Sequence, residues 1–159
     1  MSDDINAIKT LIAKGADPTQ DHGISNTTVL KHAIYEKKYD VVKELLASPK
    51  IDKSKFKGFL KPALYNEDLE LCLMLIDRGA DINTNDIAKS ALYLAAIVKK
   101  DKAAVQKLKN HGGLDLTTEQ YLEQKMTTVI NLLKEKKDKD PVYGEILEIL
   151  EPGASAQKH

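Results

Sequence analysis

The stretch LCLMLIDRGAD, residues 71–81, decides the fold, because an amphipathic run in it ends at a glycine. The pattern recurs 64 positions earlier, where Gly15-Ala16-Asp17 corresponds to Gly79-Ala80-Asp81. Apolar residues at i, i+3 and i+4 before the first glycine share one face of a helix: Ile8, Leu11 and Ile12. The glycine then stands where helices end in a left-handed residue.

Two fainter copies of this pattern fill the gaps. The run at 41–46 ends at Ser48-Pro49, and the run containing Val105 and Leu108 ends at Gly112-Gly113. The four helix ends, at residues 15, 49, 79 and 112, are separated by 34, 30 and 33 residues. Each of the last three units also has an earlier helix, marked by Leu30 with Ala33, Leu60 with Ala63, and Leu92 with Ala95. The sequence therefore predicts an all-α fold of helix-turn-helix repeats of about 33 residues.

These repeats resemble the ankyrin repeat family. The second-helix pattern of the family stands here as VVKELL at 41–46, its repeat end as GADIN at 79–83, and its first-helix pattern as TVLKHA at 28–33. The resemblance covers residues 5–116. It implies an ankyrin-like α-solenoid of about three full repeats, preceded by an N-terminal half repeat that keeps only its second helix. Thr28 and Ser90 keep the hydroxyl that caps the first helix in the family.

The C-terminal part departs from the repeat pattern. Thr117-Thr118-Glu119-Gln120 has the form of a capping box, and it predicts a helix that continues through Met126 to Leu133. Pro141 predicts the start of a second helix. We expect residues 117–151 to form a helical cap on the repeats of residues 1–116, within one domain, and residues 152–159 to form a flexible tail.

Composition narrows the function classes. The 159 residues carry 24 basic and 24 acidic side chains, so the net charge is zero and general attraction to nucleic acid or anionic lipid is not expected. There is one cysteine, no signal peptide is visible, and no apolar run approaches the roughly 20 residues needed to cross a bilayer. We expect a monomeric cytoplasmic protein, either in its own cell or in a host cell as a secreted effector.

No group of residues in the sequence indicates catalysis. Cys72 lies between two leucines at an apolar position of the repeat, which favours a buried, inert thiol. The four histidines lack the spacing of a zinc site. Gly112-Gly113 lacks the pattern of a phosphate-binding loop. We predict no catalytic residues, no metal site, no cofactor and no small-molecule substrate.

A basic segment gives an alternative function. Residues 50–61 carry five lysines against one aspartate, with Phe56 and Phe59 between them. Basic and aromatic side chains together bind phosphate backbones and stack on bases. Lys50–Lys61 is therefore a candidate for binding nucleic acid or an anionic surface. The interpretation that we favour is a solvated loop whose phenylalanines pack onto the repeats, so nucleic acid is not the expected partner.

The resemblance also implies where a partner protein would bind. Family contact positions on the first helices fall on three pairs of residues, and those on the loops fall on four single residues: Tyr35 and Glu36, Tyr65 and Asn66, Ile97 and Val98; then Ser25, Lys55, Lys57 and Lys89. Tyr35, Tyr65 and Ile97 are expected to form a stripe across three repeats. The sequence thus predicts a non-enzymatic protein–protein interaction module that binds through the concave face of a solenoid.

Overall fold

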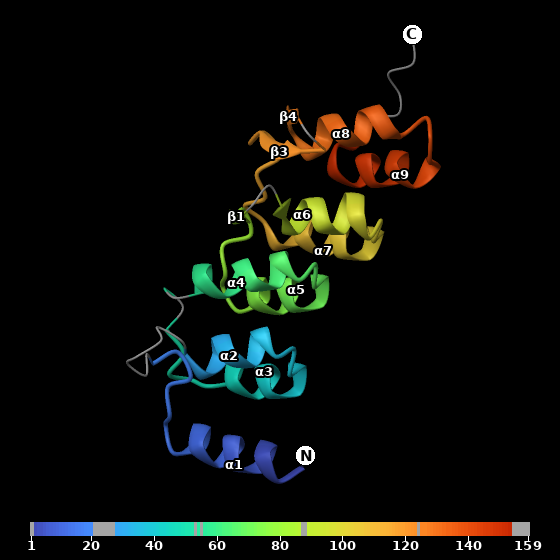
Figure 1. Cartoon of the computed structure of the whole chain (residues 1–159). Helices are drawn as coiled ribbons and strands as arrows, with labels where there is room; N and C mark the ends of the chain where they lie inside the picture. Colours follow the sequence, from blue (N-terminus) through green and yellow to red (C-terminus); the bar gives the residue numbers. More distant parts are fainter. Residues whose placement is uncertain are drawn as a thin grey trace.

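The computed structural model describes residues 2–20, 28–52, 54, 56–86, 89–123 and 125–153, and over these residues the fold is all-α, as predicted. A single helix, α1 (Ser2–Ala13), is followed by helix pairs stacked one on another from the N-terminus to the C-terminus (Figure 1). The pairs are α2 (Val29–Tyr35) with α3 (Tyr39–Leu46), and α4 (Phe56–Tyr65) with α5 (Leu69–Asp77). They continue with α6 (Ala91–Tyr93) and its π-helical extension η2 (Leu94–Val98) beside α7 (Lys102–His111), and with α8 (Val129–Lys136) beside α9 (Pro141–Leu150).

Two short antiparallel hairpins connect the later pairs. Strand β1 (Asn85–Asp86) pairs with β2 (Lys89–Ser90), and β3 (Gln120–Leu122) pairs with β4 (Lys125–Thr127). These connections lie on one side of the stack, whereas the tight turns inside the pairs lie on the opposite side (Figure 1). Each first helix therefore runs from the hairpin side to the turn side.

Hydroxyl caps start three of the first helices, α2, α6 and α8. The Oγ1 of Thr28 accepts a hydrogen bond from the backbone N–H of Lys31 at 3.1 Å, and the Oγ of Ser90 accepts one from Tyr93 at 3.1 Å. Both predicted caps are confirmed. Thr128 does the same for α8, accepting from Asn131 at 3.0 Å. The sequence TTVI at 127–130 repeats TTVL at 27–30, so α8 begins as a first helix of the same kind.

The helix predicted to start at Thr117 is wrong. The carboxylate of Asp115 accepts hydrogen bonds from the hydroxyls of both Thr117 and Thr118, and from their backbone N–H groups at 2.7 and 3.2 Å. These bonds form a tight turn, and they use the hydroxyls that would cap a helix. The chain then enters the β3–β4 hairpin, and α8 starts only at Val129.

A left-handed residue lies in the turn of each of the first three pairs, and an aspartate follows it in the second and third pairs. Lys37, Glu67 and Lys100 have φ of 54°, 54° and 52°. Each directly precedes the N-cap of a second helix. Asp68 accepts from the N–H of Leu71 at 3.0 Å and Asp101 from that of Ala104 at 2.9 Å, which satisfies N–H groups that have no partner within the helix.

A continuous apolar core runs through the stack. Buried alanines, among them Ala33, Ala63 and Ala95, stand at the same place in successive first helices, where a small side chain lets helices approach closely. Cys72 is fully buried in α5, as predicted, at the position that Val42 and Val105 hold in α3 and α7. Burial raises the pKa of its thiol to about 12, and the charge of Asp68 adds to the shift. The thiol is therefore uncharged at neutral pH.

Polar contacts join each layer of the stack to the next. Ion pairs join each second helix to the next, starting from α1: Lys9–Glu44 at 3.3 Å, Lys43–Glu70 at 3.6 Å, Asp77–Lys107 at 2.5 Å, and Lys102–Glu145. On the connection side, Thr19 Oγ1 accepts from the N–H of Asp52 at 3.1 Å, and Asn83 Oδ1 accepts from that of Asp115 at 2.8 Å. Exposed ion pairs contribute about 0–1 kcal/mol each, so these contacts set register more than stability.

Candidate protein-binding face

Tyr35 and Tyr65 hold equivalent places at the ends of α2 and α4. Each is the last residue of its helix and lies two residues before a left-handed residue, Lys37 or Glu67. Their side chains are 54% and 73% exposed, which is high for tyrosine. Both predicted side chains thus lie on the surface, at the turn side of neighbouring pairs.

The third pair contains one residue more than the first two. The carbonyl of Ala33 accepts from the N–H of Lys38 and that of Ala63 accepts from Asp68, five residues on, whereas Ala95 accepts from Asp101, six residues on, at 2.8 Å. The extra residue is absorbed by the π-helical turn η2, in which the N–H of Lys99 bonds to the carbonyl of Leu94 at 2.9 Å. Such a turn is how a helix accommodates a one-residue insertion.

The insertion corrects the predicted stripe. Ile97 was expected beside the two tyrosines, but it is buried, with 6% of its surface exposed. Val98 instead lies two residues before the left-handed Lys100 and is 38% exposed. The wider turn rotates the end of the helix, so Ile97 points to the core and Val98 to solvent. We call Tyr35, Tyr65 and Val98 the apolar stripe.

A groove lies beside the stripe. It has a volume of about 1060 Å³, is open to solvent and lies between the turns of the second and third pairs, with Tyr39 at its edge. One wall carries acidic residues and the other carries lysines: Glu67, Asp68 and Glu70 from the α4–α5 turn, and Lys99, Lys100 and Lys102 from the η2–α7 turn. Asn66, a predicted contact residue next to Tyr65, lines this groove, and Glu36 is exposed at the same turn position of the first pair.

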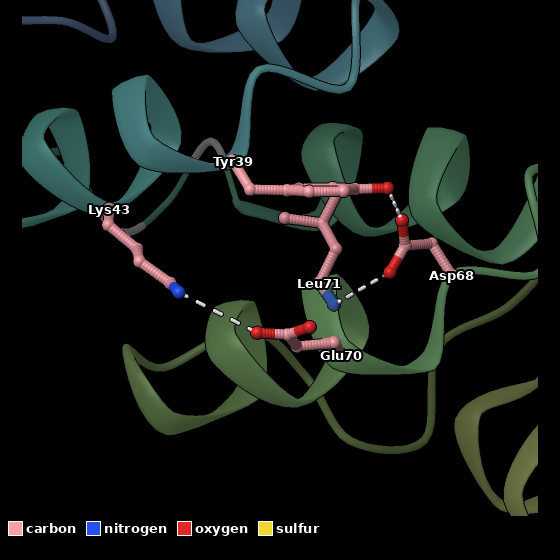
Figure 2. Close-up of polar contacts among 5 residues, drawn as sticks. All are labelled: Tyr39, Lys43, Asp68, Glu70 and Leu71. Atoms are coloured by element: carbon pink, nitrogen blue, oxygen red, sulfur yellow. Dashed lines mark hydrogen bonds and ion pairs between the residues drawn. The ribbon is translucent and has the colours of Figure 1, made fainter.

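Tyr39 and Asp68 hold the acidic wall in place, and no pattern in the sequence predicts this pair. The hydroxyl of Tyr39, at the start of α3, donates a hydrogen bond to one oxygen of the Asp68 carboxylate, whose other oxygen caps α5 (Figure 2). This bond raises the pKa of Tyr39 to about 12, with burial adding to the effect. Lys43 pairs with Glu70 beside it (Figure 2). Contacts from α3 of the preceding pair therefore hold the α4–α5 turn in position.

Contacts from the following pair, α8 and α9, hold the lysine wall of the groove in the same way. Lys100 bonds to Asp140 at 2.6 Å, and its ammonium group lies 5.0 Å from the ring centroid of Tyr143. The hydrogen bond with Asp140 raises the pKa of Lys100. Lys102 pairs with Glu145 on α9. Charged side chains held in this manner offer fixed positions for complementary groups.

The structure describes two of the four predicted loop contacts, Lys57 and Lys89. Ser25 and Lys55 lie outside the residues that the structure describes. Lys57 lies in α4 and Lys89 in β2, and the structure describes only their backbone. Strand β2 leads into α6 on the hairpin side, and Val98 ends η2 eight residues later, which is about 12 Å of helix at 1.5 Å per residue. The predicted set therefore divides between the two sides of the stack.

The basic segment does not offer its aromatic side chains to a ligand. Phe56 is fully buried and Phe59 nearly so, and their ring centroids lie 6.0 Å apart at 57°. Both rings pack into the core, as the favoured interpretation predicted, but residues 56–61 belong to helix α4 and not to a loop. Lys53 and Lys55 lie outside the described residues. Nucleic-acid bases therefore cannot stack on these phenylalanines, and only the lysines of the segment still favour a nucleic-acid site.

Within the described ranges, no three His, Cys, Asp or Glu side chains come together as a metal would require. Among those same residues, no helix combines the length and the apolar character needed to cross a membrane.

Comparison of the chain with protein-family models, with curated proteins and with solved structures gives no match.

Proposed function

We propose that this chain is a non-enzymatic, ankyrin-like repeat protein that binds another protein through the apolar stripe and the groove beside it. The proposed partner is a cytoplasmic protein of the same cell or of a host cell. The observation that carries the proposal is the exposure of an apolar side chain at the same turn position in three successive pairs, Tyr35, Tyr65 and Val98.

Several features support the ankyrin-like description. The repeat length is about 33 residues in the sequence, α2, α6 and α8 begin at hydroxyl caps, and short hairpins connect the later pairs. The second helices follow tight turns, and successive pairs stack in chain order (Figure 1). A stack of this kind exposes one helix end and one turn per repeat, which together make an extended surface.

The exposure of Tyr35 and Tyr65 favours a role for both side chains in binding a partner protein. A tyrosine buries 150–250 Å² when it is fully covered, roughly. Because Tyr35 and Tyr65 are 54% and 73% exposed, packing within the chain accounts for less than half of each. Tyrosines are common among the residues that carry most of the binding energy at interfaces. The charged walls of the adjacent groove would set the orientation of the partner.

The test compares the double variant Tyr35→Ala/Tyr65→Ala with wild type and with Leu11→Ala. Leu11 is a matched control, since it is an exposed apolar residue on α1, away from the stripe. Immobilised proteins capture partners from lysate, and quantitative mass spectrometry identifies any protein that wild type and the control retain but the double variant loses. The purified partner is then titrated against all three.

We expect each tyrosine to contribute about 2 kcal/mol to binding, or roughly thirtyfold in affinity. The double variant should remain folded in a denaturant melt. An unchanged affinity in the folded double variant would refute the proposal. An affinity that instead falls steeply with salt, and ignores both substitutions, would favour the basic segment Lys50–Lys61.

A further inference from the structure

One face of α2 is uncovered where the same face of every later first helix is covered. Val29 directly follows the cap residue and is 44% exposed. The residues at this place in the following first helices are all buried: Phe59, Ala91 and Val129. Three residues further along, His32 is exposed, whereas its counterparts are buried: Pro62, Leu94 and Leu132. The contrast holds at two positions of one helix face, so it belongs to the face and not to one side chain.

The stack itself shows what normally borders a first helix. Helix α2 packs against α4, and η2 packs against α8, so the first helices form a row. Helix α1 lies against α3, in the row of second helices. At the N-terminal end of the described stack no other helix stands beside α2 in the row of first helices (Figure 1). In the described part of the chain, the side of α2 away from α4 therefore has no first helix packed against it.

This place is a groove with apolar walls. Its volume is about 890 Å³, and apolar side chains from three helices line it: Ile5 and Ile8 from α1, Val29 and Ala33 from α2, and Val41 from α3. Among the described residues that line it, Lys37 and Lys38 carry positive charges and Asp40 carries the negative charge. An apolar floor with a basic edge is complementary to an apolar stripe flanked by acidic residues.

We propose that this groove binds an amphipathic α-helix of a partner protein, with acidic residues along the edges of its apolar face. The helix would take the place next to α2 that α4 takes on the other side, at the 8–10 Å separation typical of packed helices, roughly. Apolar residues at i, i+3, i+4 and i+7 would contact Val29 and Ile8. A second copy of this chain fits less well, because a symmetric contact would bring the lysines of both copies together.

The test uses two fluorescent peptides of about 14 residues, which is four helical turns. Both carry leucines at i, i+3, i+4 and i+7; one has glutamates at the flanking positions and the other has lysines. Fluorescence anisotropy measures their binding to wild type, to Val29→Lys and to Val98→Lys. The two variants are matched, since both replace a partly exposed valine by lysine, one in the groove and one in the apolar stripe. Circular dichroism checks that both are folded.

We expect saturable binding of the acidic peptide to wild type and to Val98→Lys, with a loss of about tenfold or more for the basic peptide and for Val29→Lys. Equal binding of the two peptides, no saturable binding, or an equal loss in Val98→Lys would overturn the proposal. Sedimentation equilibrium supplies a further arm: a dimer of wild type that Val29→Lys abolishes would assign the groove to a second copy instead. None of these readouts depends on the partner of the apolar stripe.

Discussion

Asp68 carries two interactions at once, and its removal gives a sharp test of the architecture. One carboxylate oxygen caps α5 through the N–H of Leu71 at 3.0 Å, and the other accepts the hydroxyl of Tyr39 (Figure 2). Loss of an N-cap costs about 1 kcal/mol. Loss of a hydrogen bond to a charged group costs about 1.5–3 kcal/mol, and partial solvent exposure places this one near the lower value. Asp68→Ala should therefore lower the free energy of unfolding by about 2–3 kcal/mol.

Asp101 provides the matched control. It caps α7 through the N–H of Ala104 at 2.9 Å in the same turn position of the next pair, and no tyrosine bond to it is found among the described residues. Asp101→Ala should cost about 1 kcal/mol, the cap alone. Tyr39→Phe should cost about 1–2 kcal/mol, since it removes the hydrogen bond and keeps the ring.

The assay is equilibrium unfolding in urea, followed by far-UV circular dichroism, for wild type, the three single variants and the double variant Tyr39→Phe/Asp68→Ala. Because both single changes break the same bond, the double variant should be little less stable than Asp68→Ala, with a coupling energy of about 1–2 kcal/mol. Equal costs for Asp68→Ala and Asp101→Ala, or strictly additive costs for Tyr39→Phe and Asp68→Ala, would refute this account of the turn.

Four further predictions follow from the structure. Since the folded-state pKa of Tyr39 is raised from 10.0 to about 12, its stabilising effect is complete below pH 10 and is lost as pH rises through 12; alkaline melts should show wild type losing stability relative to Tyr39→Phe. Cys72 is fully buried and should react slowly with a thiol reagent until denaturant is added; rapid labelling in buffer would contradict its place in the core. Ile97→Lys should destabilise the fold by several kcal/mol, about the cost of burying an unpaired charge, whereas Val98→Lys should change it by less than about 1 kcal/mol; equal effects would place the insertion elsewhere. Removal of residues 117–159 should expose buried side chains of η2 and α7, which contact α8 and α9, and lower solubility or the melting temperature; an equally stable truncation would show that the stack ends earlier.

The repeat itself could be predicted from the sequence because its signals are local. The caps at Thr28 and Ser90 and the burial of Cys72 depend on apolar spacing and on hydroxyl residues within one or two helix turns. The structure confirms these points. Apolar spacing and hydroxyl caps predict which residues face the core in helix pairs that have no inserted residue.

The errors come from competing local chemistry and from length. Thr117 and Thr118 have the form of a helix cap, but the neighbouring Asp115 takes their hydroxyls first. Counting forward from Ala95 places Ile97 beside the tyrosines, and only the position of the π turn reveals that Val98 belongs there. The bond between Tyr39 and Asp68 joins residues 29 positions apart, and no short pattern indicates it.

The π turn in the third pair has a wider meaning for how such a surface can change. A single additional residue between Ala95 and Asp101 exchanges the side chain presented to solvent, Val98 for Ile97, while the carbonyl of Ala95 still bonds to the start of the next helix. Neighbouring pairs keep their caps and their core. Insertion or deletion of one residue in a first helix can thus change which side chain a repeat exposes at its turn, without any substitution there and without disturbing the repeats on either side.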